Sequence, residues 1–296
     1  MKAHLPVFVL LGASVLWGLS WWPLKGINAM GIDGIVLIFI VYGILSLVFT
    51  PLLFKQFAHY KRHPKAMLLI ALFGGGASLA FTYALINGEV IRVMVLFYLL
   101  PLWGVLGGKL FLHEQIDKWR YLGAALAILG AFIILGGFEV FDSPLQWIDL
   151  IALLSGLLFT LNNLVFRAAQ EVKVASKIGA MFYGTFTLAA LLLLGGVESF
   201  PEFISTQAWS GLFLYALVWL LLANIGSQWG VTHMEAGRSS IIIIMELLTA
   251  VVSATLIAGE IMNAHEYLGG VLIVAAAFIE ALRTKDDNIP TTTTSL

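Results

Sequence analysis

Long apolar runs separated by short polar clusters dominate the pattern along this chain. The runs are apolar on all helical faces, unlike the one-sided stripe of a helix at a water-exposed surface. A helix needs roughly 20 mainly apolar residues to cross a hydrocarbon core about 30 Å thick. We therefore predict an all-α membrane protein with ten transmembrane helices. The predicted spans are residues 5–24, 34–54, 67–86, 93–112, 121–138, 147–166, 178–197, 211–231, 239–258 and 265–282.

Composition supports lipid as the solvent of this protein. The 296 residues are 60% hydrophobic and 11% charged, with a mean hydropathy of +0.96, whereas a soluble domain carries about 25% charged residues. The net charge of -1 offers no basic field for nucleic acid, and the lack of cysteine excludes disulfides and thiolate chemistry. The first apolar run resembles a signal peptide, but it is long and has no small-residue cleavage site, so we expect it to be the first span.

Loop charges predict the orientation of the ten spans. With the N-terminus inside, all 16 lysines and arginines except Lys25 and Arg92 fall on the cytoplasmic side. One helix more or fewer would invert every later loop and destroy this bias. We therefore expect both termini in the cytoplasm, with a disordered tail at 285–296.

The chain also contains an internal repeat. A shift of 146 residues aligns Arg92 with Arg238, together with glutamates before and after each arginine and a Tyr-Leu-Gly triplet. Each unit holds five predicted spans, and because five is odd, the second unit enters the membrane in the opposite sense. We predict two inverted five-helix repeats, at 1–143 and 144–284, an architecture typical of secondary transporters.

Four short motifs occur in a fixed order across the two units. They are Trp17-Gly18 followed by Lys25, the segment 83–92, Leu100-Pro101-Leu102 before Glu114, and Glu246-Leu247-Leu248 before Glu260. Their order and duplication resemble the drug/metabolite transporter superfamily, and within it the proteins with two EamA domains. Members often carry a Glu-Pro pair in the fourth or ninth helix, whereas here Pro101 follows a leucine and Glu246 precedes one. This departure leaves open which repeat carries the hinge.

The resemblance implies a central cavity lined mainly by helices 1, 3, 4, 6, 8 and 9, and transport of small organic metabolites or drugs. We expect a multi-pass protein of the plasma membrane, the inner membrane in a bacterium, surrounded by the lipid bilayer and present as a monomer or homodimer. It would move its solute by alternating access, without a cofactor or a metal. Export, and an amino acid or amphipathic amine as the solute, rest on the resemblance and on one acidic residue.

Glu246 is the sharpest individual candidate. It lies about 10 Å inside the cytoplasmic end of the ninth predicted span, at 1.5 Å per residue. An ionisable group at this depth is a functional candidate by default. It could hold an amine or carry a coupled proton, because an apolar environment favours the neutral form of a carboxyl group. The alternative is a structural, protonated carboxyl that is hydrogen-bonded to a neighbouring helix.

Four amides are candidates for a polar pocket. Asn224 and Gln228 are four residues apart and share a helix face. Asn162 and Asn163 are adjacent, so we expect only one of them to face inward. Interhelical hydrogen bonding is the competing explanation for all four.

Aromatic residues form the third group of candidates. A tryptophan near the middle of the membrane, such as Trp17, is not explained by anchoring at the headgroups. Such rings could stack on flat or cationic solutes, although core packing explains each of them equally well. The candidates for the cavity lining are Trp17, Trp21, Tyr83, Tyr98 and Trp103.

Two features suggest points of bending. Pro101, near the middle of the fourth predicted span, is expected to kink it and to free a backbone carbonyl. Gly75, within a run of three glycines, allows bending or, more simply, close packing between helices.

Machinery for an enzyme is not encoded in any motif that we find. The histidines fall at loops or span ends, and neither an HExxH motif nor a P-loop occurs. The remaining rival to a transporter is a membrane receptor or scaffold, which would tolerate loss of Glu246 or Asn224 without losing its function.

Overall fold

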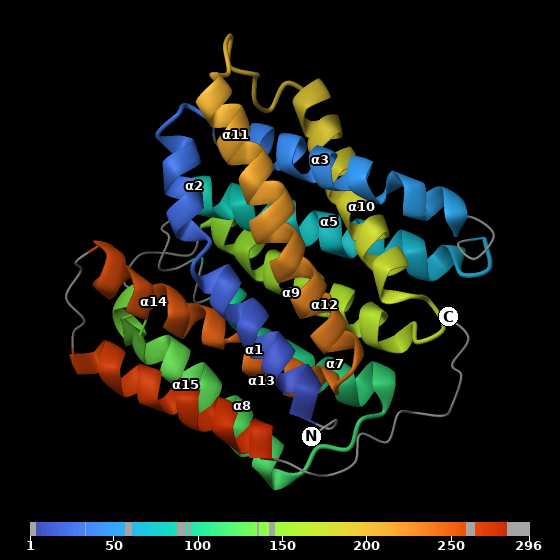
Figure 1. Ribbon diagram of the computed structural model, residues 1–296. Coiled ribbons are helices and arrows are strands. Elements are labelled where there is room, and N and C mark those ends of the chain that lie inside the picture. Colours follow the sequence, from blue (N-terminus) through green and yellow to red (C-terminus); the bar gives the residue numbers. More distant parts are fainter. Residues whose placement is uncertain are drawn as a thin grey trace.

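The computed structural model describes residues 4–32, 34–56, 61–87, 93, 96–134, 136–141, 146–258 and 264–282 (Figure 1). These residues form helices and connections, with no strand among them. The all-helical fold predicted from the apolar runs is therefore confirmed for this part of the chain. The predicted tail at 285–296 lies outside the described residues, as does Glu260.

Helices occupy both halves of the chain in the same order. The first half contains α1 (Leu5–Gly18), α2 (Trp21–Asn28), α3 (Gly34–Lys55), α5 (Pro64–Asn87), α7 (Leu100–Leu112), α8 (Lys118–Ile134) and the short 3₁₀ turn η2 (Gly137–Phe141). The second half contains α9 (Trp147–Ala168), α10 (Val174–Leu194), α11 (Thr206–Leu214), the π-helical η3 (Tyr215–Leu220), α12 (Leu221–Thr232), α13 (Ala236–Ile243), α14 (Met245–Ala258) and α15 (Ala264–Leu282).

Among the described residues, seven helical segments are long and apolar enough to cross a membrane. They are Leu5–Leu24, Gly34–Lys55, Pro64–Ala84, Trp147–Ala168, Val174–Leu194, Thr206–Thr232 and Ala236–Ile257. Two shorter apolar helices follow the same pattern, Leu100–Leu112 and Tyr267–Ile279. These nine segments each overlap a different one of the ten predicted spans, while the remaining span, 121–138, corresponds largely to α8.

Helix interruptions fall at equivalent places in the two halves. Before α7, Tyr98 and Leu99 form a turn, and Pro101 lies in the first turn of α7. Because proline lacks an N–H and clashes with the preceding turn, it is favoured at a helix start. In the second half, Ile244 separates α13 from α14. A shift of 146 residues places Tyr98 on Ile244, so the helix breaks coincide with the sequence repeat.

The second interruption forms without a proline. The hydroxyls of Ser239 and Ser240 donate to the carbonyls of Ala236 and Gly237, three residues earlier in each case, at 3.0 and 2.9 Å. Such bonds give the backbone an alternative to the regular helical ladder.

Equivalent helices of the two halves make equivalent contacts. α8 lies beside α15, and α3 packs on α10 (Figure 1). α5 packs against α9, as its counterpart α12 packs against α1. α7 contacts α9, as α14 contacts α1, and α7 also meets α13 at the centre.

Glycines allow the closest of these approaches. A Cβ on Gly269 of α15 would lie 2.5 Å from the carbonyl oxygen of Gly130 on α8. A Cβ on Gly75 of α5 would lie 2.7 Å from the carbonyl carbon of Gly184 on α10. Both distances are shorter than real Cβ contacts, so backbone meets backbone along these seams.

Side chains from the two connections also join α3 to α10. Glu198, in the connection after α10, accepts hydrogen bonds from the N–H groups of Ile35 and Val36 at 2.7 and 3.0 Å and so caps the start of α3. Gln56, directly after α3, accepts a hydrogen bond from the hydroxyl of Ser176 in the first turn of α10.

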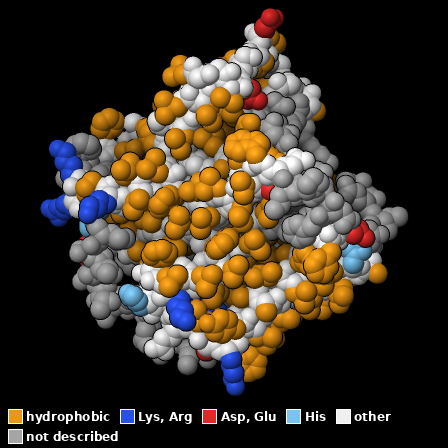
Figure 2. All heavy atoms as spheres, turned by 180° about the vertical axis from the view of Figure 1, so that it is seen from behind, with side chains coloured by type: hydrophobic (Ala, Val, Ile, Leu, Met, Phe, Trp, Pro, Cys, Tyr) orange, Lys and Arg blue, Asp and Glu red, His pale blue; other side chains and the backbone are white. Residues whose placement is uncertain are grey.

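The outer surface is strongly apolar. Figure 2 shows hydrophobic side chains covering the centre of one face, with lysine and arginine side chains near its margin. Phe8, Leu47, Leu194 and Leu256 are 68%, 73%, 85% and 79% exposed. This surface suits hydrocarbon, in which exposed leucine and phenylalanine cost nothing.

Candidate functional site

Glu246 lies at the second helix interruption. It is partly buried in the first turn of α14, directly after the break at Ile244. It is close enough to the buried Tyr98, at the first interruption, for the two groups to interact electrostatically. Gly18, at the end of α1, also approaches it, since a Cβ there would lie 2.5 Å from the Glu246 carbonyl oxygen. Both helix breaks and the end of α1 therefore meet around this residue.

Asn162, Asn163 and Gln228 form a buried amide cluster between α9 and α12. The Asn162 amide nitrogen donates to the Gln228 and Asn163 side-chain oxygens, both at 3.4 Å, and lies 4.0 Å from the sulfur of Met181. Both asparagines are buried, at 0% and 6% exposure. The expectation that only one of them faces inward is wrong, because helices surround α9 on several sides.

Asn224 belongs to a different group, although it shares a helix with Gln228. Its amide nitrogen donates to the carbonyl of Leu220 at 2.8 Å, and its side chain neighbours Tyr42. Tyr42 of α3 also neighbours Ser78 of α5. α12 thus carries two polar groups, one toward α3 and α5 and one toward α9.

A small cavity of about 10 Å³ lies where α7, α9 and α13 meet. This is room for about one water molecule. Leu100, the counterpart of Glu246 in the first half, borders it, and so does Asn163. The remaining lining residues are Gly104, Thr160, Ala236, Ser239, Ser240 and Ile243.

The predicted aromatic lining is spread over several helices. Trp21 donates from its indole nitrogen to the Ser253 hydroxyl at 2.9 Å and thereby joins α2 to α14. Trp17 and Tyr83 are partly buried, and Tyr98 is the aromatic residue that lies beside Glu246 among these candidates. The indole nitrogen of Trp103 is buried without a hydrogen-bond partner among the described residues.

The two predicted bending points have different surroundings. Pro101 starts α7 and so marks a break, where the sequence predicted a kink within one continuous span. Gly75 lies in the tight contact between α5 and α10. A gating role for either residue stays a prediction.

Two basic residues that the sequence places among the loop charges are buried in the structure. Arg167 of α9 and Lys177 of α10 are 5% and 0% exposed. Arg167 donates to the Thr232 carbonyl at 3.2 Å, and the Lys177 ammonium lies 3.3 Å from the Thr232 hydroxyl. Their spacing in sequence gives no sign of this burial.

A second charged cluster joins the two halves of the chain. Glu114, after α7, accepts hydrogen bonds from the N–H groups of Ala236 and Gly237 at 2.8 and 3.4 Å, and so caps α13. Arg120 of α8 lies 3.7 Å from Glu114 and is directly paired with Glu235. Burial raises the pKa of Glu114, and the hydrogen bond from Ala236 only partly opposes this shift.

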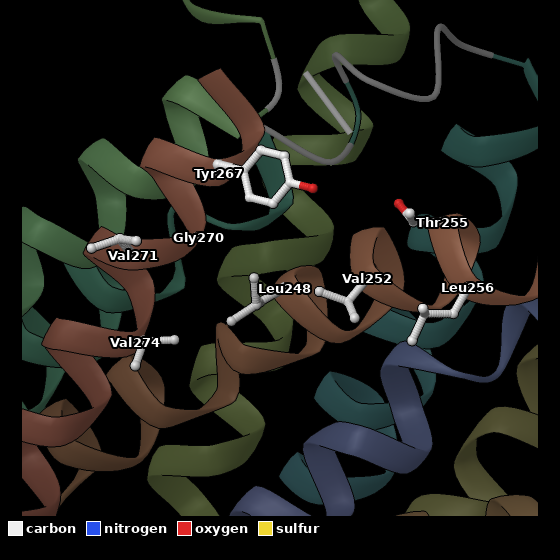
Figure 3. Close-up of a pocket in the computed structure, with 8 residues that line it drawn as sticks. All are labelled: Leu248, Val252, Thr255, Leu256, Tyr267, Gly270, Val271 and Val274. Carbon is white, nitrogen blue, oxygen red and sulfur yellow. The ribbon is translucent and has the colours of Figure 1, made fainter. Parts of the chain in front are cut away.

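A groove of about 450 Å³ lies apart from all these polar groups (Figure 3). It runs between α14 and α15, with Tyr267 at one side and Leu248, Val252 and Leu256 along the other. Tyr267 and Leu256 are 60% and 79% exposed. The groove therefore belongs to the outer apolar surface and not to the polar interior.

Among the described residues, no group of three histidine or acidic side chains could hold a metal ion. The described residues could contact a bound molecule through ionisable and amide side chains and through the backbone at two helix breaks. This chemistry suits reversible binding through hydrogen bonds and charge.

Known proteins resemble the chain in sequence and in fold. Residues 4–136 match the EamA-like transporter family. The biotin transporter of Salmonella typhimurium is 26% identical over 242 residues, which cover 79% of this chain and 78% of that protein. Protein RarD of the same organism is 25% identical over 201 residues, and the match spans 65% of each chain. A crystal structure with 15% sequence identity covers 94% of this chain and 98% of its own, with a TM-score of 0.77, and so has the same fold.

Proposed function

We propose that this chain, whose residues 4–136 match the EamA-like transporter family, is a secondary transporter of the drug/metabolite transporter superfamily that exports a small organic solute. The solute class is an amino acid or an amphipathic amine. The protein alternates access to a central site in the bacterial inner membrane, with coupling to protons through Glu246.

One observation carries this proposal. Glu246 lies in the first turn of α14, at a helix break whose counterpart in the other half is the break at Tyr98 and Leu99. Secondary transporters bind their solutes near the midplane, at broken helices where two repeats meet. A partly buried carboxylate at such a break gives an amine a charged partner.

The contacts between helices support two inverted repeats of five spans, 1–143 and 144–284. The contact between α5 and α9 corresponds to the contact between α12 and α1 when the halves are exchanged, and α3–α10 and α8–α15 each join equivalent helices. With both termini in the cytoplasm, the cluster of Glu114, Arg120 and Glu235 lies on the cytoplasmic side. There it ties the first half to the start of α13 and closes this side of the protein.

Ligand binding tests the assignment of Glu246. Amines, amino acids, biotin and neutral drugs are compared by their effect on the thermal unfolding midpoint Tm of the detergent-purified protein, because a ligand of the folded state raises its stability. We expect an amine to raise Tm more at high pH and to lose this effect in Glu246→Gln. Glu202→Gln, which changes an exposed carboxylate, is the matched control.

Transport in proteoliposomes tests the function itself. A proton gradient of the exporting sign should drive the amine found in the binding assay across the membrane with the wild type and not with Glu246→Gln. A receptor or scaffold would bind the compound without moving it. A neutral or anionic ligand that is indifferent to Glu246→Gln would refute the amine site and leave the amide cluster as the place to test.

A further inference from the structure

Two buried cations, Arg167 and Lys177, lie together at the ends of α9, α10 and α12. They are 5% and 0% exposed. Neither pairs with an acidic side chain in the part of the chain that the structure describes, where the ion pairs involve other residues. Buried charge without a counter-charge is costly, and in membrane helices such residues mark functional sites.

Backbone carbonyls at helix ends supply part of the compensation. The Lys177 ammonium donates to the carbonyls of Phe166 and Ala169, the latter at 3.3 Å, at the end of α9. Arg167 donates to the carbonyl of Thr232, the last residue of α12, at 3.2 Å. The C-terminus of a helix carries roughly half a negative charge. Two helix ends thus offset only part of the positive charge, and the start of α10, where Lys177 lies, adds to it.

The shape of the basic pair suits a planar anion. A guanidinium has five N–H donors in a rigid fork that matches a carboxylate. Among the described residues, Arg167 uses only Nη1, for the Thr232 carbonyl. Most of the fork is therefore left for another acceptor.

The pair also lies next to the polar interior. Thr232 follows Gln228 by one helical turn, and its hydroxyl donates to the Gln228 carbonyl at 2.7 Å. Gln228 in turn belongs to the amide cluster with Asn162. Polar groups thus continue from the cluster to the ends of α9 and α12.

We propose that Arg167 and Lys177 bind the carboxylate of the transported solute at the cytoplasmic end of its path. This inference rests on the proposed transport function and deepens it, because an amino acid would meet a basic site here and an acidic one at Glu246. When the helix ends separate, Lys177 exchanges its carbonyl partners for the anion. A carboxylate carries one negative charge and is less costly to bury here than a phosphate monoester, which carries nearly two at pH 7.

The test uses anions that lack an amine, so that Glu246 does not contribute. The Tm of the full-length protein is measured with sodium acetate, butyrate and benzoate, each against its amide, and with inorganic phosphate, all at equal ionic strength. We expect the three acids to raise Tm, the amides to leave it unchanged, and phosphate to act more weakly. Arg167→Gln should weaken acid binding at least about tenfold, as expected for loss of a charge-assisted hydrogen bond. Lys173→Gln, at an exposed position four residues before Lys177, should leave binding unchanged.

A second pair of variants tests the site independently, in case Arg167→Gln does not fold. Thr232→Asp places a carboxylate beside Lys177, and Thr232→Asn is its neutral control. We expect the aspartate variant to have the higher ligand-free Tm and to lose the response to added acids. Acids that act no better than amides, a response that survives Arg167→Gln, a preference for phosphate, or an aspartate variant no more stable than the asparagine one would each overturn the site. Amine binding at Glu246 and transport in proteoliposomes are measured separately, so the proposed function can stand when this site fails.

Discussion

Arg120 gives the most direct test of how the two halves are held together. Its side chain is 1% exposed and lies between Glu114, 6% exposed, and Glu235, 22% exposed. Arg120→Gln keeps most of the volume but leaves both carboxylates without their cation. Removing one partner of a buried pair costs about 3–5 kcal/mol. Because Glu235 is partly solvated, we expect about 3 kcal/mol, which corresponds to a fall in Tm on the order of 6–10 °C.

The assay combines stability with accessibility. Tm of the purified variant is compared with that of the wild type and of Arg62→Gln, which removes an exposed arginine. The chain has no cysteine, so a single Ser239→Cys reports on the small cavity beside α13. We expect a membrane-impermeant maleimide added from the cytoplasmic side to label this thiol slowly in the wild-type background and faster when Arg120 is replaced.

A double variant tests whether the charges of this cluster are coupled. Adding Glu235→Gln to Arg120→Gln should restore part of the lost stability, because it removes an orphaned carboxylate. A Tm within about 1 °C of the wild type for Arg120→Gln, with unchanged labelling, would show that these charges neither stabilise the fold nor close this side.

Three further outcomes follow from the structure. Burial raises the pKa of Glu114, so the folded state binds more protons than the unfolded state between the ordinary glutamate pKa of 4.5 and the raised value. The Tm of the wild type should therefore rise relative to that of Glu114→Gln as pH falls through this range, and a constant difference would contradict the shift in pKa. Gly269→Ala should lower Tm, because the new Cβ would lie 2.5 Å from the Gly130 carbonyl oxygen. Gly12→Ala, with open space around it, should leave Tm unchanged, and equal Tm values for the two variants would refute the close contact between α8 and α15. Glu198→Ala should cost about 1 kcal/mol of stability by uncapping α3, as measured by Tm, while Glu202→Ala in the same connection should cost little, and equal losses would argue against the cap.

The chain by itself determined the solvent, the helices and the repeat. These features are local or periodic, since an apolar run of about 20 residues predicts a span wherever it lies. The break at Pro101 also had a local sign, because proline cannot continue a helix. The matching break at Ile244 had none, since no proline is present there; Ser239 and Ser240, at the start of the same helix, bond back to its carbonyls. Glu246 was found because a charge inside an apolar run stands out, whereas its role and those of the other site residues stay predictions.

Tertiary structure decided which polar groups meet. Asn224 and Gln228 share a helix face in sequence, yet packing places one beside Tyr42 and the other beside Asn162. Arg167 and Lys177 look like loop charges in the sequence, but the ends of α9 and α12 and the start of α10 come together and bury them. A hydrophobic pattern tells how each helix meets lipid, but lipid and a neighbouring helix are equally apolar. The contacts between helices therefore depend on shape and on paired polar groups, which only the folded chain brings together.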